Sequence, residues 1–308
     1  MKPTTLVWRF CDGKPGHDRQ SAGLVAALAA HQPTTVLNLP AADYPHAWRY
    51  WWRGGWPGGA AAQRPQLVVG AGRACAWPVL AAARAQQAMS LYLMNPPVPR
   101  CLFDLCLIPR HDGVAPGRGV IVTEGVLNDL TASTGPRLGP VLVLVGGPSR
   151  HHAWDEADLL RQLASLVYGT PARHFLISDS RRTPASTTAA LRDFVQPGVA
   201  LLSHTTAASG WLPSALLAAP SAWVTADSVS MLYEAQSAGC AVGLLAVPAR
   251  RVDRITDLAA ALLASGRVSS LSQWLAAGRL PPPAAPLAEA ARASRLVAAR
   301  LLAGRGGC

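Results

Sequence analysis

The chain has 308 residues, of which 50% are hydrophobic and 15% charged, and its formal net charge is +11. This composition excludes extended disorder, and the length favours two domains because a single hydrophobic core rarely grows this large. The basic residues are scattered, so they favour an anionic ligand or an anionic membrane surface. The chain shows no nucleic-acid-binding motif, and we expect no nucleic acid as a partner.

The cysteines form no Cys-x-x-Cys pair and no His-rich pattern, so we expect buried thiols in a reducing compartment and no metal site. They are Cys11, Cys75, Cys101, Cys106, Cys240 and Cys308. No apolar run approaches the roughly 20 residues that span a bilayer, and the N-terminal segment lacks the apolar region of a signal peptide. We therefore expect a cytoplasmic protein, either free or peripheral on the inner face of the membrane.

Short apolar runs rich in β-branched residues recur through the first half of the chain, with alanine-rich helical segments among them. Strands that alternate with helices predict a parallel sheet with helices on both faces. The expected strands cover residues 5–10, 34–39, 66–69, 90–94, 105–108 and 119–123, and the expected helices cover residues 21–30 and 74–87.

The polar segment 12–20 connects the first expected strand to the first expected helix. Its glycines let a ligand approach the backbone, and the following helix offers free N–H groups and a positive dipole potential. It is neither a Walker A loop nor a dinucleotide fingerprint. We expect it to face a polar or anionic ligand, and a plain solvated turn is the alternative. The candidate residues are Gly13, Lys14, Gly16, His17 and Arg19.

Four of the ten tryptophans lie within residues 48–56, where they alternate with arginines. Aromatic and basic side chains together suit a membrane interface or a lipid-like acceptor. Core packing explains several of these tryptophans equally well, so both interpretations stay open.

The alternation of strands and helices restarts after the polar, glycine-rich segment 131–139, which we expect to be a linker. A second α/β unit is therefore predicted. Its expected strands cover residues 140–145, 173–177, 199–203, 221–224 and 241–245, and its expected helices cover residues 154–167 and 228–237. The predicted domains are residues 1–135, residues 136–283, and a C-terminal piece, residues 284–308, whose helix packs back on the body and whose tail frays.

Three strand ends of the second half carry polar residues. Ligands of open parallel sheets collect at the carboxyl ends of strands, where arginine forks and helix starts bind phosphate. Plain turns, helix caps and solvated side chains are the alternative. The candidate donor-binding residues are Gly146, Gly147, Ser149, Ser180, Arg181, Asp227, Ser228, Ser230 and Glu234.

The ordered segments 12–20, 123–128, 146–149, 178–184 and 226–231 resemble those of bacterial relatives of the plant "elongated mitochondria" fission-protein family. That family in turn resembles the GT-B class of glycosyltransferases and the related nucleotide-sugar epimerases. The resemblance implies an α/β fold with two Rossmann-like domains whose parallel sheets face each other across a cleft. It places the acceptor mostly on the N-terminal domain and the nucleotide sugar mostly on the C-terminal one.

Under this resemblance, His17 matches the histidine of the first glycine loop in the lipid-linked peptidoglycan glycosyltransferase, near the acceptor. Gly146 and Gly147 match a glycine turn that opens the donor domain, and Glu234 matches the ribose-binding glutamate. The pattern departs from that enzyme at Lys14-Pro15, where the enzyme has further glycine and threonine, so the acceptor is not identified.

We expect metal-independent, inverting transfer of a sugar from a nucleotide-sugar donor, with no cofactor and with His17 as the general base. Helix starts with Ser228, Ser230 and Arg181 would meet the charge of the diphosphate, and the chain contains no Asp-x-Asp metal anchor. A lipid-linked or envelope acceptor at the membrane surface is one option. The alternatives are a nucleotide-sugar epimerase on the same fold and a non-catalytic, membrane-associated, fission-like scaffold.

Overall fold

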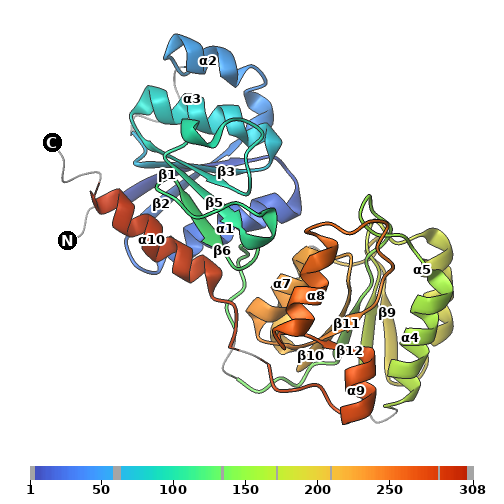
Figure 1. The fold of residues 1–308 in the computed structure, drawn as a ribbon. Coiled ribbons are helices and arrows are strands. Elements are labelled where there is room, and N and C mark those ends of the chain that lie inside the picture. Colours follow the sequence, from blue (N-terminus) through green and yellow to red (C-terminus); the bar gives the residue numbers. More distant parts are fainter. Residues whose placement is uncertain are drawn as a thin grey trace. The chain divides into compact units, whose positions relative to one another are not determined.

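The computed structural model describes residues 4–57, 64–132, 135–170, 173–208, 210–283 and 285–303 (Figure 1). The chain divides into two compact units. Unit 1 contains Met1–Asp129 and Ala288–Cys308, and unit 2 contains Leu130–Leu287. The cleft expected between their sheets stays a prediction.

Unit 1 is built around six parallel strands in the order β2-β1-β3-β4-β5-β6. Val7 of β1 pairs with Val36 on one side and with Leu67 on the other, so β1 lies inside the sheet. Buried parallel strands need apolar residues on both faces, which explains the nearly continuous apolar runs. The strands are β1 (Thr5–Cys11), β2 (Thr34–Pro40), β3 (Leu67–Ala71), β4 (Met89–Leu93), β5 (Leu105–Pro109) and β6 (Val120–Thr123).

Helices cover both faces of this sheet (Figure 1). Successive strand residues point to opposite faces. Val7 and Leu91 therefore pack with the helices α1 and α10, whereas Trp8 and Tyr92 pack with α3. The helices are α1 (Pro15–Ala29), α2 (Ala47–Arg53), α3 (Ala76–Gln86) and α10 (Glu289–Ala303), with short 3-10 turns η1 (Ala41–Asp43), η2 (Arg73–Cys75), η3 (Arg100–Leu102) and η4 (Arg110–Asp112).

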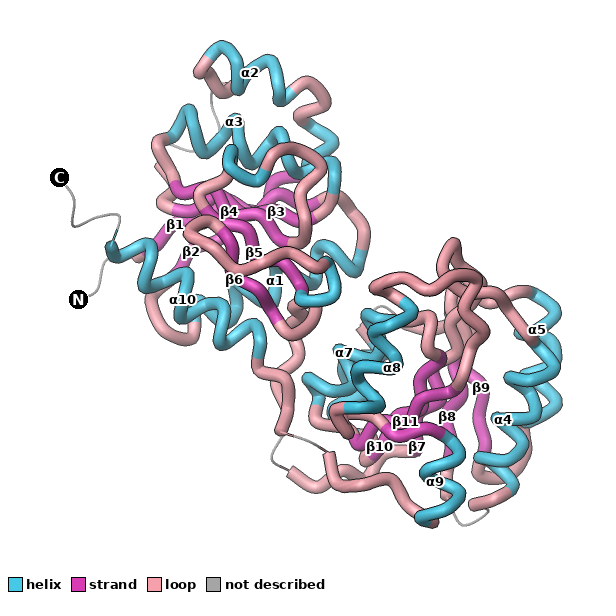
Figure 2. The backbone as a smooth tube through the Cα atoms, viewed as in Figure 1, coloured by secondary structure: helices cyan, strands magenta, loops and turns pink. Residues whose placement is uncertain are grey.

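Unit 2 repeats this plan with the strand order β12-β11-β10-β7-β8-β9, again parallel. Figure 2 shows the strands of this sheet in magenta with helices on both sides. The strands are β7 (Val141–Leu144), β8 (Phe175–Ser178), β9 (Val199–Leu202), β10 (Ser221–Thr225), β11 (Ala241–Leu245) and β12 (Ser269–Ser270). The helices are α4 (Glu156–Tyr168), α5 (Ala185–Leu191), α6 (Trp211–Ala218), α7 (Val229–Ala238), α8 (Thr256–Ala264) and α9 (Leu271–Ala277), with a 3-10 turn η5 (Arg192–Phe194).

One face of the unit 2 sheet buries Val143, Ile177 and Trp223 against Leu163 of α4. Trp223 needs a glycine beside it, because a Cβ on Gly243 would lie 2.3 Å from its ring. The helix α7 packs against β10 and β11. Figure 1 shows α7 and α8 on the side of the sheet away from α4 and α5.

The predicted α/β fold with two parallel sheets is confirmed, and three local expectations are corrected. The helix α1 begins at Pro15, so His17 lies in the first helical turn and the loop itself is only residues 12–14. Proline at the first helical position is favourable because its missing N–H would have no partner there. The helices α2, α6, α8 and α9 were not predicted, because segments of seven to nine residues are too short to show a helical period.

The third correction concerns the cysteines. Cys101 is exposed and Cys11 is half-buried, so the expectation of buried thiols is wrong for both. Cys101 lies in η3, a turn on the surface between β4 and β5. Burial raises the pKa of Cys75 and Cys106 to about 12 and that of Cys240 to about 11, so these three thiols are protonated near neutrality. Cys308 lies outside the described residues.

Candidate functional site

The first candidate site of unit 1 is a histidine and an aspartate at the carboxyl end of β1. Asp12 follows β1 directly, and its Oδ2 lies 2.8 Å from Nδ1 of His17. The aspartate side chain is 2% exposed and the imidazole 24%. Because a carboxylate only accepts, the proton of a neutral His17 lies on Nδ1 and Nε2 is the basic nitrogen. Nε2 has no hydrogen-bond partner among the described residues, so the pair has the form of a base oriented by a carboxylate.

Gly72, directly after β3, closes over this pair. Its φ is +85°, and a Cβ there would lie 2.2 Å from Nδ1 of His17 and 2.4 Å from Oδ2 of Asp12. Only glycine adopts this positive φ without strain and has no Cβ to collide with these two side chains. Because β1 and β3 are neighbours, the topology itself brings Gly72 to the pair, and the sequence offered no local signal for this contact.

The other predicted residues of this segment are two glycines and two basic residues. Gly13 has a φ of +75°, which explains the glycine by backbone conformation alone. Gly16 has an ordinary φ and nothing within 4 Å of an added Cβ, so the fold gives no reason for a glycine there. Lys14 is exposed at the N-cap position of α1. Arg19 is committed to an ion pair with Asp129 at 3.1 Å.

In unit 2 the corresponding centre is Asp227, which follows β10. Its side chain is fully buried, and its Oδ2 accepts from the N–H of Gly147 at 3.0 Å and pairs with Arg182 at 2.6 Å. Gly146 donates its N–H to the Thr225 hydroxyl at 2.8 Å. Both glycine amides are thus engaged within the protein, and the turn is a scaffold that joins the ends of β7 and β10.

Close packing explains both glycines of this turn. A Cβ on Gly146 would lie 2.3 Å from Oδ2 of Asp227, and one on Gly147 would lie 2.0 Å from the carbonyl oxygen of Arg182. The hydroxyl of Thr183 donates to the carbonyl oxygen of Gly146 at 2.5 Å. Together with Gly147, Asp227 and Arg182, these residues form a joint between strand ends. The turn therefore holds the carboxyl ends of β7, β8 and β10 together.

Two buried polar atoms at this edge have no hydrogen-bond partner among the described residues: Oδ1 of Asp227 and Nδ1 of His152. Burial lowers the pKa of His152 below its ordinary value, although the Asp227 carboxylate opposes the shift. His152 is therefore neutral near pH 7. Sequence reasoning gave it no role.

The arginine loop after β8 gives its two arginines different positions. Arg182, which is not among the predicted site residues, pairs with Asp227, whereas Arg181, the predicted diphosphate ligand, is exposed and its role stays a prediction. Adjacent residues in a turn point in different directions, and the sequence alone does not separate them. Ser180 stabilises the turn, since its N–H donates to the Thr183 hydroxyl at 2.8 Å.

The remaining predicted residues of unit 2 lie on α7 and in the loop after β7. Ser228 occupies the N-cap of α7, but its hydroxyl makes no capping hydrogen bond. Ser230 is exposed two residues further, in the first turn of the helix, and Glu234 is 8% exposed on the same helix. The hydroxyl of Ser149 accepts from the backbone N–H groups of the two residues that follow Arg150, which gives it a role in the turn.

Asp179, after β8, forms a polar cluster that the sequence analysis did not single out as a site. Its Oδ1 accepts from Nδ1 of His204 at 2.9 Å, and its Oδ2 accepts from Thr188 at 3.0 Å and Ser203 at 3.1 Å. Burial raises the pKa of Asp179, but hydrogen bonds from His204, Thr188 and Ser203 outweigh it and hold the pKa below its usual range. The signal available was a polar residue at a strand end.

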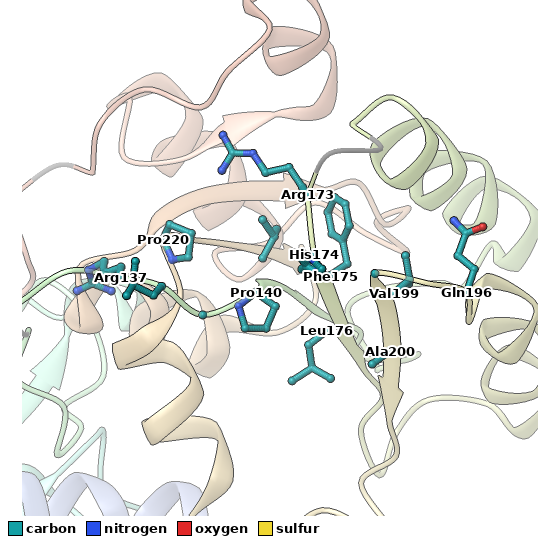
Figure 3. A pocket seen from close by; sticks show the side chains of 14 residues that line it. Arg137, Pro140, Arg173, His174, Phe175, Leu176, Gln196, Val199, Ala200 and Pro220 are labelled. Atoms are coloured by element: carbon teal, nitrogen blue, oxygen red, sulfur yellow. The ribbon is translucent and has the colours of Figure 1, made fainter.

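A cavity of about 720 Å³ lies elsewhere in unit 2, at the amino ends of β7, β8 and β9 (Figure 3). Arg137 on its wall donates to the carbonyl oxygens of Leu216 and Ala219, so its charge is already used. None of the predicted site residues line this cavity. The polar pairs at the carboxyl ends, rather than this cavity, define the candidate site.

The aromatic segment divides between the core and the surface, and its contact with a membrane stays a prediction. Trp56 stacks on Tyr44 at a centroid distance of 4.6 Å and joins the core, whereas Trp48 and Trp52 are 43% and 69% exposed. Within the described ranges, no helix combines the length and apolar character needed to cross a bilayer. The same ranges contain no group of three or more His, Cys, Asp or Glu side chains arranged to hold a metal.

Comparison with solved structures shows a shared fold. A protein from Listeria monocytogenes assigned as a UDP-N-acetylglucosamine 2-epimerase has a TM-score of 0.62 at 12% identity, covering 99% of this chain and 98% of that one. The UDP-GlcNAc 2-epimerase of Neisseria meningitidis bound to UDP-GlcNAc has a TM-score of 0.54 at 13% identity, covering 97% and 100%. MurG of Acinetobacter baumannii has a TM-score of 0.48 at 14% identity, covering 96% and 99%.

The likenesses to the two epimerase structures agree with the two parallel sheets described above, and the fold is GT-B-like. No curated protein sequence matches the chain. The family model described as Mitochondrial fission ELM1 matches residues 15–301, almost the whole length. The chain therefore belongs to the mitochondrial fission ELM1 family.

Proposed function

We propose that this protein is a metal-independent, inverting glycosyltransferase that uses a nucleotide-sugar donor. The observation that carries the proposal is the His17–Asp12 pair at the carboxyl edge of unit 1, with Nε2 of His17 unpartnered among the described residues. A partly exposed imidazole held by a buried carboxylate is the arrangement expected of a general base near neutral pH. The GT-B-like fold, shared with enzymes that act on UDP-sugars, supports the choice of donor.

In the proposed step, Nε2 of His17 takes the proton of an acceptor hydroxyl while Asp12 holds the ring and stabilises the imidazolium that forms. The hydroxyl oxygen forms a bond to the anomeric carbon on the face opposite the leaving group. The bond from the anomeric carbon to the diphosphate oxygen breaks, and its electron pair leaves with the nucleoside diphosphate. Gly16, which the fold does not require, leaves the start of α1 open for the close approach of substrate.

Unit 2 is the proposed donor-binding unit. The N-terminal turn of α7, with Ser228 and the exposed Ser230, offers N–H groups and hydroxyls to the diphosphate, and Glu234 is the proposed ribose ligand. Gly146, Gly147 and Asp227 would position this helix start by joining β7 to β10. No cofactor is part of the proposal.

The test compares the full-length protein with His17→Asn. An asparagine amide reaches the position of Nδ1, so Asp12 stays paired while the basic Nε2 is removed. Thermal shifts with UDP, GDP, ADP and dTDP measure nucleotide binding, and transfer of radiolabelled sugar from the corresponding nucleotide sugars into a bacterial lipid extract measures turnover. We expect unchanged nucleotide binding and a loss of about 100-fold or more in turnover.

Three outcomes of this test would contradict parts of the proposal. No stabilisation by any of these nucleotides would overturn the proposed function. Nucleotide binding without transfer into the lipid extract would contradict the lipid-linked acceptor. Turnover at the wild-type rate in His17→Asn would overturn only the role of His17.

A nucleotide-sugar epimerase is the second candidate, because UDP-GlcNAc 2-epimerases are among the solved structures that share the fold with TM-scores above 0.5. Incubation with UDP-GlcNAc in the absence of any acceptor separates the two activities. An epimerase produces the C2 isomer and, in heavy water, incorporates solvent deuterium at that carbon. A transferase leaves the sugar unchanged.

We also propose that α2 rests on an anionic membrane surface. Trp48 and Trp52 lie four residues apart on one exposed side of the helix, flanked by the exposed Arg49 and Arg53. Co-sedimentation with vesicles of anionic lipid should be lost in Trp48→Ala/Trp52→Ala. The matched control is Tyr168→Ala, which removes an exposed aromatic ring from unit 2. Equal sedimentation of all three proteins would contradict the proposal.

A further inference from the structure

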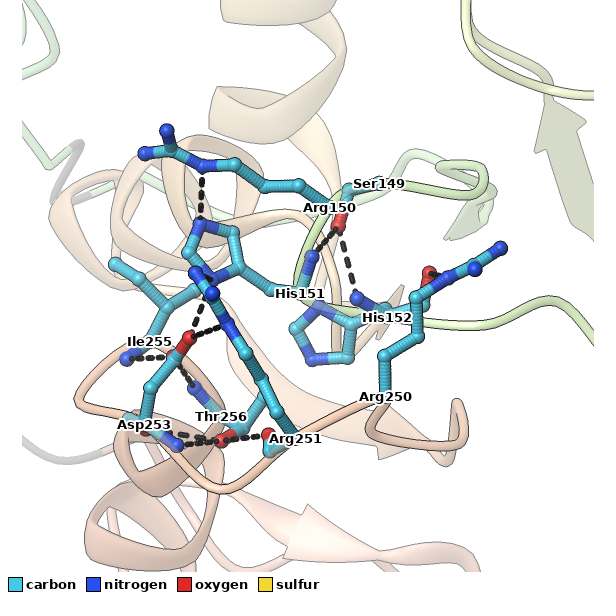
Figure 4. A network of polar contacts seen from close by, with 9 residues as sticks. All are labelled: Ser149, Arg150, His151, His152, Arg250, Arg251, Asp253, Ile255 and Thr256. Atoms are coloured by element: carbon cyan, nitrogen blue, oxygen red, sulfur yellow. Dashed lines mark hydrogen bonds and ion pairs between the residues drawn. The ribbon is translucent and has the colours of Figure 1, made fainter.

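The carboxyl edge of unit 2 carries an arginine cluster that the proposed function has not used. Arg150 and His151 lie in the loop after β7, and Arg250, Arg251 and Asp253 lie in the loop after β11 (Figure 4). Because β10 lies between β7 and β11 in the sheet, the two loops come from either side of the strand that leads to Asp227 and α7.

These two loops are joined to each other by backbone hydrogen bonds. The N–H of Ala153 donates to the carbonyl oxygen of Pro248 at 2.8 Å, and the N–H of Arg250 donates to that of His151 at 2.8 Å. His152 and Ala249 form an antiparallel bridge between them. The arginines are therefore carried on a fixed backbone.

Two of the arginines are anchored through Nε on either side of one imidazole. Nε of Arg150 donates to Nε2 of His151 at 2.8 Å, and Nε of Arg251 donates to Oδ2 of Asp253 at 2.7 Å. Nδ1 of His151 donates to the same carboxylate oxygen at 2.6 Å. An imidazole that accepts at Nε2 and donates at Nδ1 is neutral, so Asp253 is the single negative charge among these four side chains.

The anchors leave charge and hydrogen-bond donors unused. Both terminal nitrogens of Arg150 and Nη1 of Arg251 have no hydrogen-bond partner among the described residues. Nη2 of Arg251 lies 3.4 Å from Nδ1 of His151, which donates to Asp253 and does not accept. Holding two like charges around one ring costs side-chain entropy and Coulomb energy, which a solvated arginine would avoid. A guanidinium fixed at Nε presents its two terminal nitrogens as a fork, the geometry that binds a carboxylate or phosphate bidentately.

The third arginine of the cluster lies apart from this pair. Nε of Arg250 donates to the carbonyl oxygen of His152 at 3.2 Å, and Figure 4 shows its guanidinium on the other side of His152 from Arg150. It has the same charge and comes from the same pair of loops, and its guanidinium donates to the backbone of His152 and not to the His151 ring. Arg250 therefore provides a matched control.

We propose that Arg150 and Arg251 form an oxyanion site for an acidic group on the sugar of the donor, so that the preferred substrate is a nucleotide-linked acidic sugar. This inference rests on the proposed function, because it places the site beside the donor that unit 2 would bind. Ligands of open parallel sheets gather at the carboxyl ends of strands, and Arg150 and Arg251 lie at those ends next to β10. His151 and Asp253 are positioning residues, since they act by holding the two forks.

The experiment measures binding of UDP-glucose and UDP-glucuronic acid, which differ by one carboxylate, to the full-length protein by isothermal titration calorimetry. GDP-mannose and GDP-mannuronic acid provide the same comparison with another base. We expect the acidic member to bind about tenfold tighter to the wild-type protein. In Arg150→Gln/Arg251→Gln this preference disappears while the affinity for the nucleoside diphosphate alone is kept, and in Arg250→Gln the preference is kept.

Each other outcome leads to a definite conclusion. If the neutral and acidic sugars bind equally to the wild-type protein, the inference is overturned and the proposed function stands. If the double variant weakens the nucleoside diphosphate as much as the acidic sugar nucleotide, the two arginines bind the diphosphate and the acidic-sugar assignment is overturned.

If no nucleotide binds, the proposed function has failed and inorganic phosphate decides the remaining question. Phosphate binding that the double variant loses would keep an oxyanion site but overturn its assignment to a sugar. No phosphate binding would overturn the site altogether.

Discussion

Both units place an aspartate after an interior strand of a parallel sheet, yet the two carboxylates do different work. Asp12 follows β1 and holds an imidazole that is 24% exposed. Asp227 follows β10, and one oxygen of its fully buried side chain accepts from the N–H of Gly147 and pairs with Arg182. The same residue type at the same place in a fold can therefore orient a reactive group or connect loops. What differs is the partner: the imidazole of His17 keeps a basic nitrogen, Nε2, whereas the guanidinium of Arg182 has none.

Replacement of Asp227 by alanine tests this difference most severely. Asp227→Ala leaves the N–H of Gly147 buried without an acceptor and Arg182 without its counter-ion. We expect the free energy of unfolding to fall by about 3 kcal/mol, at the low end for a broken buried pair because Arg182 is 42% exposed. Urea unfolding of the full chain measures it. Asp193→Ala, an exposed carboxylate elsewhere in unit 2, should change stability by less than about 0.5 kcal/mol, and a similar small change in Asp227→Ala would contradict the joint.

The two glycines near His17 give a second, smaller contrast within unit 1. Gly72→Ala forces a left-handed backbone on alanine and pushes a methyl group into the pair, so we expect a loss of about 2 kcal/mol and reduced turnover. Gly16→Ala meets no atom and should leave stability unchanged or raise it by up to about 1 kcal/mol. Reduced substrate binding in a stable Gly16→Ala protein would mark the place where substrate approaches. Equal stability losses would show that both glycines serve the fold.

The pH dependence of the free energy of unfolding tests whether burial lowers the pKa of His152 in unit 2. The folded pKa of His152 is lowered by burial, so the unfolded chain binds more protons between the two pKa values. The contribution of His152 is complete above its unfolded pKa of about 6.5 and is lost as pH falls through the folded value. We expect the fall in unfolding free energy between pH 7.5 and pH 5.5 to be shallower in His152→Asn. An unchanged slope would show that folding does not lower the pKa of His152.

Thiol labelling compares how well the cores of the two units protect their buried cysteines. Of these experiments, it should have the smallest effect on the protein. Cys75 and Cys106 of unit 1 and Cys240 of unit 2 have raised pKa values because they are buried. Iodoacetamide at pH 8 should therefore label the exposed Cys101 and spare these three, with no change in stability. Peptide mass spectrometry reads each site. Early labelling of Cys240 alone would show that unit 2 opens more readily than unit 1.

The sequence was sufficient to predict the sheets but not the contacts at their edges. The apolar runs located β1 to β11 within about two residues, because a strand buried on both faces needs a continuous apolar run. The strand-end loops were also located, since parallel topology gathers them on one edge. The position of Gly72 over the local Asp12–His17 pair, and the pairing of Asp227 with Arg182, depend on which strands become neighbours. Strand order is a tertiary property that no local pattern in these segments encodes.

The course of the chain has a consequence for the order of folding during synthesis. Unit 2 is one uninterrupted stretch of sequence that separates the two segments of unit 1. The last helix of unit 1, α10, supplies Ala293 and Val297 to the same core as Leu24 and Leu28. The ribosome therefore releases everything unit 2 needs before it releases the final piece of unit 1. Unit 1, which carries His17, is begun first and completed last. Premature termination near the end of the message would therefore leave unit 2 complete and unit 1 without the helix that closes its core.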